Sequence, residues 1–112
     1  MDFSESLKKN REFRSVYQKG ISYADKYLVM YILKNDLNKN RVGISVSKKV
    51  GNSIIRHRLT RLIRESYRLN EAGFLCGYDM VIIARVGAKN KGYREIESAL
   101  MHLGKLHRIT VA

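Results

Sequence analysis

The sequence lacks the features that would stabilise the chain through disulfides or cysteine-bound zinc, or anchor it in a membrane. The single cysteine, Cys76, excludes an internal disulfide and a zinc site built from cysteines, so we interpret it as a small residue packed beside a strand. The longest unbroken apolar run, residues 27–33, is far shorter than the roughly 20 residues that span a bilayer. The first five residues lack the apolar core of a secretory signal. We therefore expect a reduced, cytoplasmic protein.

Proline, internal repeats and low-complexity segments are also absent, so nothing marks a boundary between domains. The 112 residues are enough for one modest core. A content of 45% hydrophobic and 29% charged residues is typical of a globular chain and not of a disordered one. We predict a single domain over residues 1–112.

Negative charge is scarce. Ten acidic residues stand against 22 lysines and arginines, which leaves a formal net charge of +12. Self-repulsion of this size indicates a polyanionic partner. The excess is concentrated in residues 41–68, where eight basic residues are opposed by one acidic residue. A membrane surface fits this segment poorly because its basic helix carries Ile and Leu in place of bulky aromatics, so we interpret the polyanion as folded RNA.

Hydrophobic periodicity predicts an α+β domain. Asn10 as N-cap and Gly20 as a C-terminal stop enclose a helix over residues 11–19. The other expected elements are strands at 27–34, 41–47 and 79–85, a basic helix after the turn 48–52, a helix at 93–107, and room for a short strand at 21–24. The polar loop 35–40 suits an antiparallel hairpin between the strands on either side. A two-layer α/β sandwich is the simplest architecture, with a right-handed crossover as the default.

The strand at 41–47 alternates between apolar and small residues. Gly43, Ser45 and Ser47 point away from the predicted core, so another surface could approach the strand backbone closely. Phe13 and Tyr17 share one helix face, and with Tyr31 they could line a groove in which unpaired bases stack. Their spacing alone favours core positions for Phe13 and Tyr17.

The basic helix has an apolar side and a cationic side. At 100° per residue, its apolar residues fall between about 220° and 340° from Arg56: Ile55, Leu59, Leu62, Ile63 and Leu69. The opposite side carries Arg56, His57, Thr60, Arg61, Arg64 and Arg68, with Arg58 at its edge beside Glu65. Lys48 and Lys49 precede the helix N-terminus, which adds partial positive charge. The alternative, a merely solvated face, is disfavoured because acidic neighbours at i,i+4 are nearly absent.

No grouping of residues predicts catalysis or metal binding by the polypeptide itself. His102 and His107 stand five apart, off the i,i+4 spacing of a metal pair on a helix. Glu95 and Glu97 diverge on the predicted helix, and Asp79 is a lone strand carboxylate. We therefore predict no catalytic residue and no metal ligand in the protein.

The central segment, VGNSIIRHRLTRLIRESYR, resembles the signature of the bacterial ribonuclease P protein component. That signature is a Val-Gly-Asn turn followed by a helix with Arg-Asn-Arg, then Lys-Arg, then Arg. The resemblance covers nearly the whole chain, because the segment 13–17 with Gly20 is similar to the opening helix of the family, and residues 28–31 and 41–47 are similar to its strands.

The resemblance implies a sandwich of the ribosomal-protein type with a left-handed β-α-β crossover through the basic helix, against the right-handed default. It also implies a function, that of the non-catalytic protein subunit of an endoribonuclease whose RNA removes the 5′ leader from precursor tRNA. Magnesium ions would be held mainly by the RNA, and one protein is expected per RNA subunit. The alternatives are a ribosomal or general RNA-binding protein, and a stand-alone nuclease that would depend on Asp79 or Glu65.

The resemblance assigns roles by position. The residues implied to bind the catalytic RNA are Lys48, Lys49, Arg56, His57, Arg58, Arg61, Arg64 and Arg68. The cleft for the single-stranded leader is implied to contain Phe13, Tyr17 and Tyr31. The chain departs from the family pattern at His57, in place of Asn, and at Thr60, in place of Lys. Histidine can still donate to phosphate, in a manner sensitive to pH, whereas Thr60 removes one positive charge.

Overall fold

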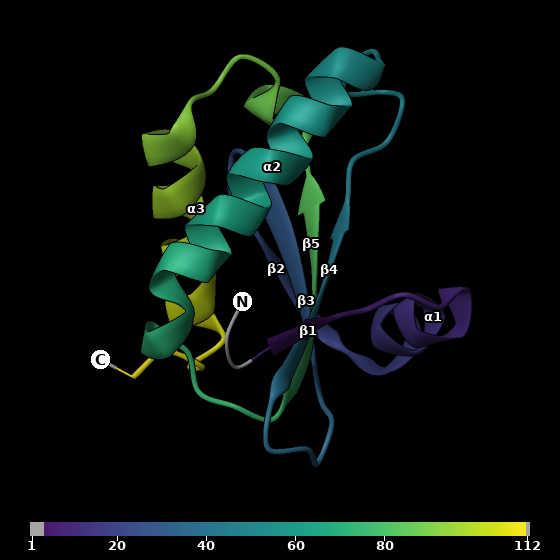
Figure 1. The fold of residues 1–112 in the computed structure, drawn as a ribbon, viewed down its shortest axis with the longest axis vertical. Coiled ribbons are helices and arrows are strands. Elements are labelled where there is room, and N and C mark those ends of the chain that lie inside the picture. The colour runs from purple at the N-terminus through teal and green to yellow at the C-terminus, as the bar shows by residue number, and fades with distance from the viewer. Residues whose placement is uncertain (1–3, 112) are drawn as a thin grey trace.

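The computed structural model describes residues 4–111, which form a mixed five-stranded sheet with helices on both of its faces (Figure 1). The strands are β1 (Ser4–Ser6), β2 (Ile21–Ala24), β3 (Leu28–Lys34), β4 (Asn40–Ser45) and β5 (Tyr78–Ala84). The helices are α1 (Asn10–Lys19), α2 (Ser53–Asn70) and α3 (Tyr93–Leu106), with short 3-10 helices η1 (Glu71–Gly73) and η2 (Val86–Ala88). The α+β class is confirmed, and each predicted helix and strand is present with slightly shifted ends.

The strand order is β1-β4-β5-β3-β2, with β5 parallel to β4 and antiparallel to β3. The predicted hairpin of β3 and β4 through residues 35–40 is wrong, because β5 lies between the two strands. Met80, Val81 and Ile82 of β5 are fully buried. A strand that is apolar on both faces is stable in the middle of a sheet whose two faces are covered. The edge strand β1 was not predicted, since Ser-Glu-Ser carries no apolar alternation.

The main core lies between the sheet and the pair α2 and α3, which cover the same face (Figure 1). Its fully buried side chains include Leu28, Met30, Met80, Ile82, Leu59, Ile63, Tyr67, Ile96, Leu100 and Leu103. Helix α2 connects β4 to its parallel neighbour β5. The left-handed sense of this crossover stays a prediction.

Helix α1 covers the opposite face of the sheet, so the domain has three layers and not the predicted two (Figure 1). Val16 of α1 and Val81 of β5 are fully buried in a second, smaller core. A Cβ atom on Gly43 would lie 2.5 Å from Cε1 of Phe13, so this ring rests directly on the backbone of β4. The expected close approach of another surface is confirmed at Gly43, where that surface is α1, whereas Ser47 is exposed beyond the end of β4.

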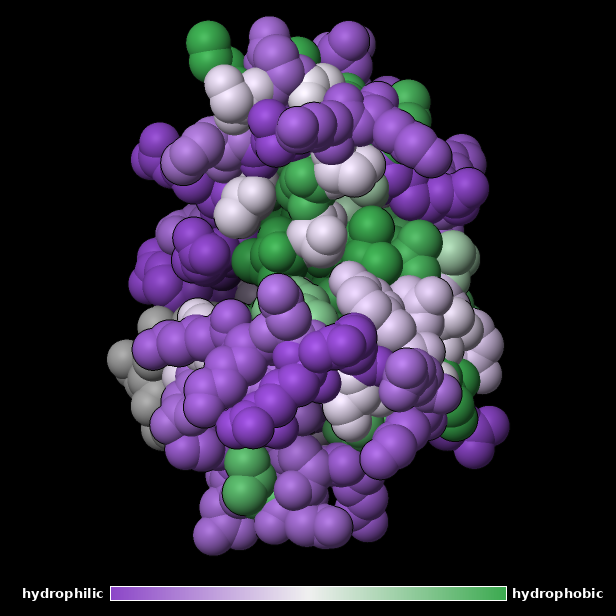
Figure 2. Space-filling model, turned by 90° about the vertical axis from the view of Figure 1, so that its right-hand side faces the viewer, coloured by the Kyte–Doolittle hydropathy of each residue, from purple (hydrophilic) through white to green (hydrophobic). Residues whose placement is uncertain are grey.

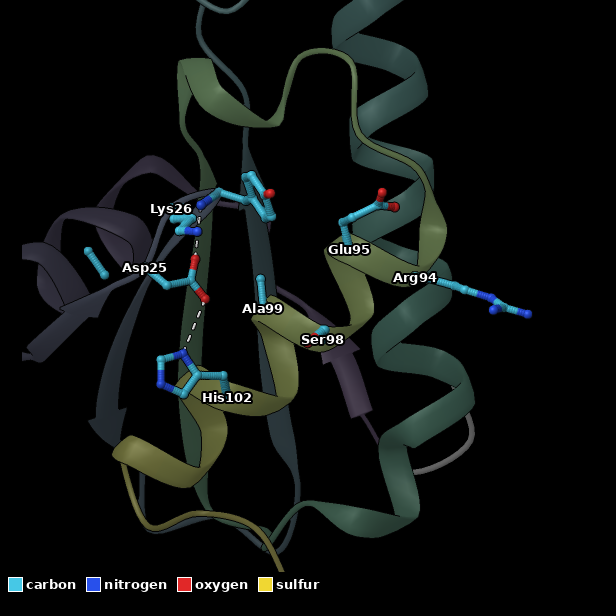
Figure 3. A pocket seen from close by; sticks show the side chains of 9 residues that line it. Asp25, Lys26, Arg94, Glu95, Ser98, Ala99 and His102 are labelled. Carbon is cyan, nitrogen blue, oxygen red and sulfur yellow. Dashed lines mark hydrogen bonds and ion pairs between the residues drawn. The ribbon is translucent and has the colours of Figure 1, made fainter.

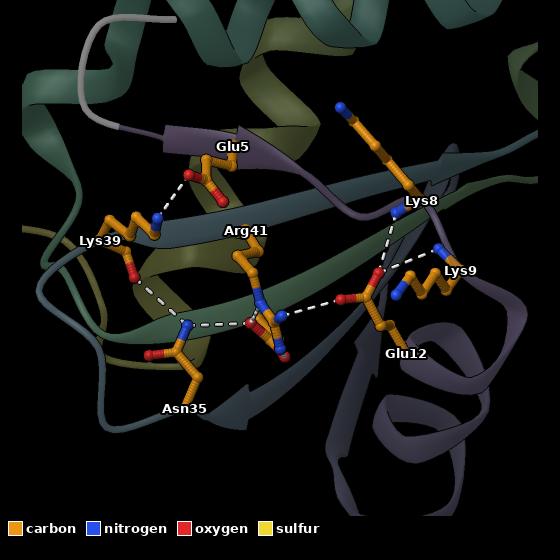
Figure 4. A network of polar contacts seen from close by, with 8 residues as sticks. Glu5, Lys8, Lys9, Glu12, Asn35, Lys39 and Arg41 are labelled. Atoms are coloured by element: carbon orange, nitrogen blue, oxygen red, sulfur yellow. Dashed lines mark hydrogen bonds and ion pairs between the residues drawn. The ribbon is translucent and has the colours of Figure 1, made fainter.

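A cluster of charged residues fastens α1 to the sheet (Figure 4). Nε and Nη2 of Arg41 donate to the two carboxylate oxygens of Asp79 at 2.8 and 2.6 Å, and Nη1 donates to Glu12 at 2.8 Å. Asp79 is only 4% exposed and also accepts from Nδ2 of Asn35 at 2.9 Å. Asp79 is therefore not a lone carboxylate, and Arg41 is engaged inside the fold.

The carboxylate of Glu12 also caps α1. It accepts the backbone N–H groups of Lys9 at 2.9 Å and Lys8 at 3.1 Å. These hydrogen bonds, followed by the charge of Arg41, hold the pKa of Glu12 below its usual range. The N-cap is Lys9 and not the predicted Asn10, and Glu12 at the third helical position binds the backbone N–H of this cap residue, as the acidic residue of a capping box does.

The substitution Arg41→Met should lower the free energy of unfolding by about 3 kcal/mol, because it leaves the buried carboxylate of Asp79 without its charged partner. Urea denaturation followed by circular dichroism at neutral pH measures this loss. The control Lys34→Met removes an exposed lysine from the end of β3 and should change stability by less than about 0.5 kcal/mol. Equal effects of the two substitutions would show that the cluster does not stabilise the fold.

Candidate RNA-binding surfaces

Helix α2 presents its basic side to solvent. Leu59, Ile63 and Tyr67, spaced four apart, are fully buried in the main core. We define the α2 cationic face as the exposed residues His57, Arg61, Arg64 and Arg68 together with the half-buried Arg56 and Thr60. The predicted division of this helix into a docking side and a cationic side is present in the structure.

The docking side differs from the prediction at its C-terminal end. Leu69 was placed in the apolar stripe but is 57% exposed, whereas Tyr67 is fully buried. Steps of four residues from Leu59 through Ile63 to Tyr67 advance about 400° each, so the buried stripe drifts around the helix and turns Leu69 outward. The hydroxyl of Tyr67 lies 2.7 Å from Oγ of Ser4 in β1, which satisfies its polar group inside the core.

Arg58 is occupied by a contact within the chain. Its Nη2 donates to the carbonyl of Lys91 at 2.6 Å, and its Nη1 reaches the carbonyl of Lys89 at 3.4 Å. The predicted neighbour of Arg58, Glu65, instead accepts from Nε of Arg68 at 3.1 Å. This hydrogen bond lowers the pKa of Glu65. Arg58 therefore joins α2 to the segment before α3, and its contact with RNA stays a prediction.

Arg56 and Thr60 lie where the α2 cationic face meets the buried side of the helix. Oγ1 of Thr60 donates to the carbonyl of Arg56 at 2.9 Å, so its hydroxyl proton is used within the helix. Nε of Arg56 is buried and has no hydrogen-bond partner among residues 4–111. Buried donors are nearly always paired, so this unpaired Nε is an exception within the described part of the chain.

The turn that leads into α2 is cationic, as predicted. Lys48 and Lys49 are exposed, while the adjacent Val50 is 2% exposed and anchors the turn to the main core. Oδ1 of Asn52 caps the helix by accepting the backbone N–H of Ile55 at 3.0 Å. The N–H of Arg56 makes the first helical hydrogen bond, to the carbonyl of Asn52 at 2.9 Å, so the N–H groups of Ser53 and Ile54 lie at the open end of the helix, next to the two lysines.

The three aromatic residues meet on the other face of the sheet, under α1. The rings of Tyr17 and Tyr31 stand edge to face, with centroids 5.1 Å apart and planes at 81°. Tyr17 is 38% exposed, and Phe13 and Tyr31 are half-buried. Burial raises the pKa of Tyr17, and the nearby side chain of Ser45 partly offsets this rise. The rings therefore pack against the second core and still leave part of their surface accessible.

Three further residues extend this surface beyond the rings. Val29, Ile83 and Ser45 are register neighbours across β3, β5 and β4, and all three are half-buried. Figure 2 shows an apolar surface on this side of the molecule, bordered above and below by hydrophilic side chains. We name these three residues and the three aromatics the aromatic cleft. Val29 could have been identified from the sequence, because it lies two positions before Tyr31 and so shares its face of β3. Ile83 could not, because only the strand order brings it beside Val29 and Ser45.

The two surfaces meet at the edge of the sheet. Arg64 of the α2 cationic face and Phe13 of the aromatic cleft line the same small pocket of about 90 Å³, together with Gly43, Ile44 and Tyr67. The α2 cationic face and the aromatic cleft are therefore adjacent at this edge of the sheet.

Within residues 4–111, no group of three or more His, Cys, Asp and Glu side chains could hold a metal ion. In the same range, no helix is long and apolar enough to cross a membrane. The magnesium requirement of a partner RNA and the cytoplasmic location both stay predictions.

Comparison with known proteins identifies the family. Residues 1–107 match the family described as Ribonuclease P. The chain belongs to the ribonuclease P protein family. The ribonuclease P protein component of Lachnoclostridium phytofermentans is 64% identical over 106 residues, which cover 95% of this chain and 91% of the relative. That of Clostridioides difficile is 50% identical over 114 residues, covering 99% and 100%. The structure of the Staphylococcus aureus RNase P protein aligns with a TM-score of 0.86 at 36% identity, covering 93% of this chain and 95% of that one.

Membership confirms the resemblance seen in the sequence. The chain is a protein component of the ribonuclease P endoribonuclease, which matures the 5′ end of precursor tRNA, and it associates with the ribonuclease P RNA. The contacts of individual residues with RNA stay predictions. Arg41 and Asp79 pair with each other inside the domain, and this structural role accounts for both residues without a contact to RNA.

The substitution Gly43→Ala tests whether Phe13 must lie on the backbone of β4. The new methyl group would stand 2.5 Å from Cε1 of Phe13, so the ring and α1 have to move. We expect a loss of about 1–3 kcal/mol in the free energy of unfolding, measured by urea denaturation. Gly73→Ala is the matched control, because a Cβ at Gly73 meets nothing within 4 Å. If both variants are equally stable, α1 does not seat as closely on β4 as the structure shows.

Proposed function

We propose that the α2 cationic face and the turn before it bind the catalytic RNA, and that the aromatic cleft receives the single-stranded 5′ leader of precursor tRNA. The observation that carries the first half is the one-sided exposure of Arg61 and Arg64 on a helix whose opposite side buries Leu59, Ile63 and Tyr67 in the main core. Neither guanidinium has a carboxylate partner among the ion pairs within residues 4–111. Each therefore keeps its full set of donors for phosphate.

The composition of the α2 cationic face suits an RNA backbone. Planar guanidinium groups bind phosphate in a bidentate manner, and Lys48 and Lys49 add point charges at the helix N-terminus. His57 is exposed and can donate to a phosphate or a 2′-hydroxyl. Thr60 contributes less, because its hydroxyl proton is directed at the carbonyl of Arg56.

The aromatic cleft suits an unpaired strand. Phe13, Tyr17 and Tyr31 offer partly exposed ring surface, and base–aromatic stacking tolerates any sequence because every base has a π face. The leader of a precursor tRNA is single-stranded and varies in sequence, which matches recognition by stacking. The shared pocket lined by Phe13 and Arg64 supports a continuous path between leader and catalytic RNA.

The protein's part in the reaction is binding and positioning. The magnesium ions would be held by the RNA subunit, which supplies the chemistry, with one protein for each RNA. A ribosomal or general RNA-binding role without a part in cleavage is disfavoured by family membership. Reconstitution with the cognate ribonuclease P RNA at low magnesium decides the matter, because a protein that fails to stimulate leader removal would not have this function.

Reversing charge at Arg61 and Arg64 together should weaken binding of the catalytic RNA. Loss of two phosphate contacts should also reduce the steepness of the slope of log K against log salt concentration by about 1 to 2. Binding of the cognate RNA across a series of salt concentrations measures both effects. The control Lys34→Glu/Lys105→Glu makes the same change in net charge at exposed sites off the α2 cationic face. Equal slopes for the two double variants would show that binding depends on net charge alone.

The substitution Tyr17→Ala should weaken binding of precursor tRNA to the reconstituted enzyme by about 1–3 kcal/mol, the value of one base–aromatic stack. Binding of mature tRNA, which has no leader, should be unchanged. Tyr17→Phe is the matched control, because it keeps the ring and loses only the hydroxyl that contacts Ser45. An equal loss with precursor and mature tRNA would place the role of Tyr17 outside leader binding.

A further inference from the structure

A larger pocket, of about 720 Å³, lies on the far side of the domain from the aromatic cleft, between the β2–β3 turn and α3 (Figure 3). Its walls include Asp25 and Tyr27 from the turn and Glu95, Ser98, Ala99 and His102 from α3. None of these residues belongs to the α2 cationic face or to the aromatic cleft, and the proposed function does not use them.

The β2–β3 turn that forms one wall is held in place by several contacts. Oδ1 of Asp25 accepts the backbone N–H groups of Tyr27 at 3.0 Å and Leu28 at 2.9 Å. Oδ2 of Asp25 lies 3.5 Å from Nδ1 of His102, which links the turn to α3 across the pocket. Nη1 of Arg85 donates to the Asp25 carbonyl at 2.6 Å. The pocket is therefore formed before any ligand arrives, which lowers the entropy cost of binding.

The lining combines an aromatic ring with hydrogen-bond acceptors. The half-buried ring of Tyr27 has Nζ of Lys91 5.4 Å from its centroid. Asp25, Glu95 and Ser98 all line the pocket, but the Glu95 carboxylate accepts the backbone N–H of Gly92 at 3.2 Å and in Figure 3 extends away from Asp25, so the available acceptors are the carboxylate of Asp25 and the hydroxyl of Ser98. Each carboxylate oxygen can accept more than one hydrogen bond. An aromatic wall beside acceptors suits a planar group that carries an amino donor, which is the chemistry of adenine, cytosine and guanine, and uracil lacks that amino group.

Positive charge leads from the α2 cationic face to this pocket. Arg58 on α2 is hydrogen-bonded to the carbonyls of Lys89 and Lys91, and Lys91 lies over the ring of Tyr27. Lys26 and Arg94 lie at the pocket itself, and in Figure 3 the side chain of Arg94 extends away from it toward solvent. Phosphates on either side of an inserted base would therefore meet lysine and arginine.

We propose that this pocket binds one unpaired, amino-bearing nucleobase of the RNA that α2 holds. The base lies against Tyr27, and its exocyclic amine donates to the carboxylate of Asp25. The inference rests on the proposed function, because the strand reaches the pocket along the cations that continue from α2.

The substitution Ser98→Phe tests the pocket directly. Ser98 is exposed on α3, so a phenylalanine there fills the pocket without disturbing the core, and Ser98→Ala is the matched control that leaves the pocket open. Filling should weaken binding of the cognate ribonuclease P RNA by roughly 5- to 100-fold, the effect of losing one stacked base. The salt dependence should become at most slightly shallower, because the substitution leaves the lysines and the arginine around the pocket in place. Ser98→Ala should bind within about 2-fold of the unsubstituted protein.

A second measurement locates the site and its base preference. Titration of the free protein with 5′-AMP, followed by amide NMR, should shift the signals of Tyr27, Ser98 and His102, whereas 5′-UMP at the same concentration should shift them much less. Equal responses to the two nucleotides, or responses confined to α2, would overturn the proposal. Equal RNA affinity for Ser98→Phe and Ser98→Ala would overturn it too. A failure of the unsubstituted protein to bind the RNA would instead overturn the proposed function, so the two failures are distinguishable.

Discussion

The burial of β5 on both of its faces is the constraint on which the rest of the structure depends. Met80 and Ile82 point into the main core, and Val81 points into the second core. Both faces of the sheet must therefore be covered, which places α2 and α3 on one side and α1 on the other. Because α2 buries only one side, its arginines face solvent. Because α1 is short, part of the opposite face remains open as the aromatic cleft.

The positive charge of the chain is divided between structural and available groups. Arg41 is enclosed by Asp79 and Glu12, and Arg58 is directed at backbone carbonyls. Exposed ion pairs contribute little to stability, so the arginines left without carboxylate partners cost the fold little and remain ready for phosphate. Most of the basic side chains proposed to bind RNA are thus ones that the fold leaves without a partner carboxylate among the described residues.

The three surfaces form a route around the domain. The small pocket lined by Phe13 and Arg64 joins the aromatic cleft to α2. On the other side, Arg58 joins α2 to the segment that carries Lys91, and Lys91 lies over the ring of Tyr27 in the larger pocket between the β2–β3 turn and α3. In the proposed assembly, α2 would hold the RNA at the centre, with a leader stacked on one side and a single base inserted on the other. The aromatic cleft and the pocket beside Tyr27 rely on side chains that the core or a hydrogen bond fixes beforehand, which reduces the entropy lost on binding.

Local pattern in the sequence determined the three helices, every strand except β1, the one-sided charge of α2 and the family signature, because each depends on residues within a few positions of one another. The roles of Phe13, Tyr17 and Tyr31 came from the resemblance and not from their spacing, which favoured a core position for the first two. Tertiary structure alone decided the strand order, and with it the insertion of β5 in place of a hairpin. It also decided the pairing of Arg41 with Asp79, which lie 38 positions apart, and the place of Ile83 beside Val29. These contacts depend on which strand occupies the centre of the sheet, where both of its faces are buried. The central position is determined by the packing of all strands and helices together, which local sequence does not contain.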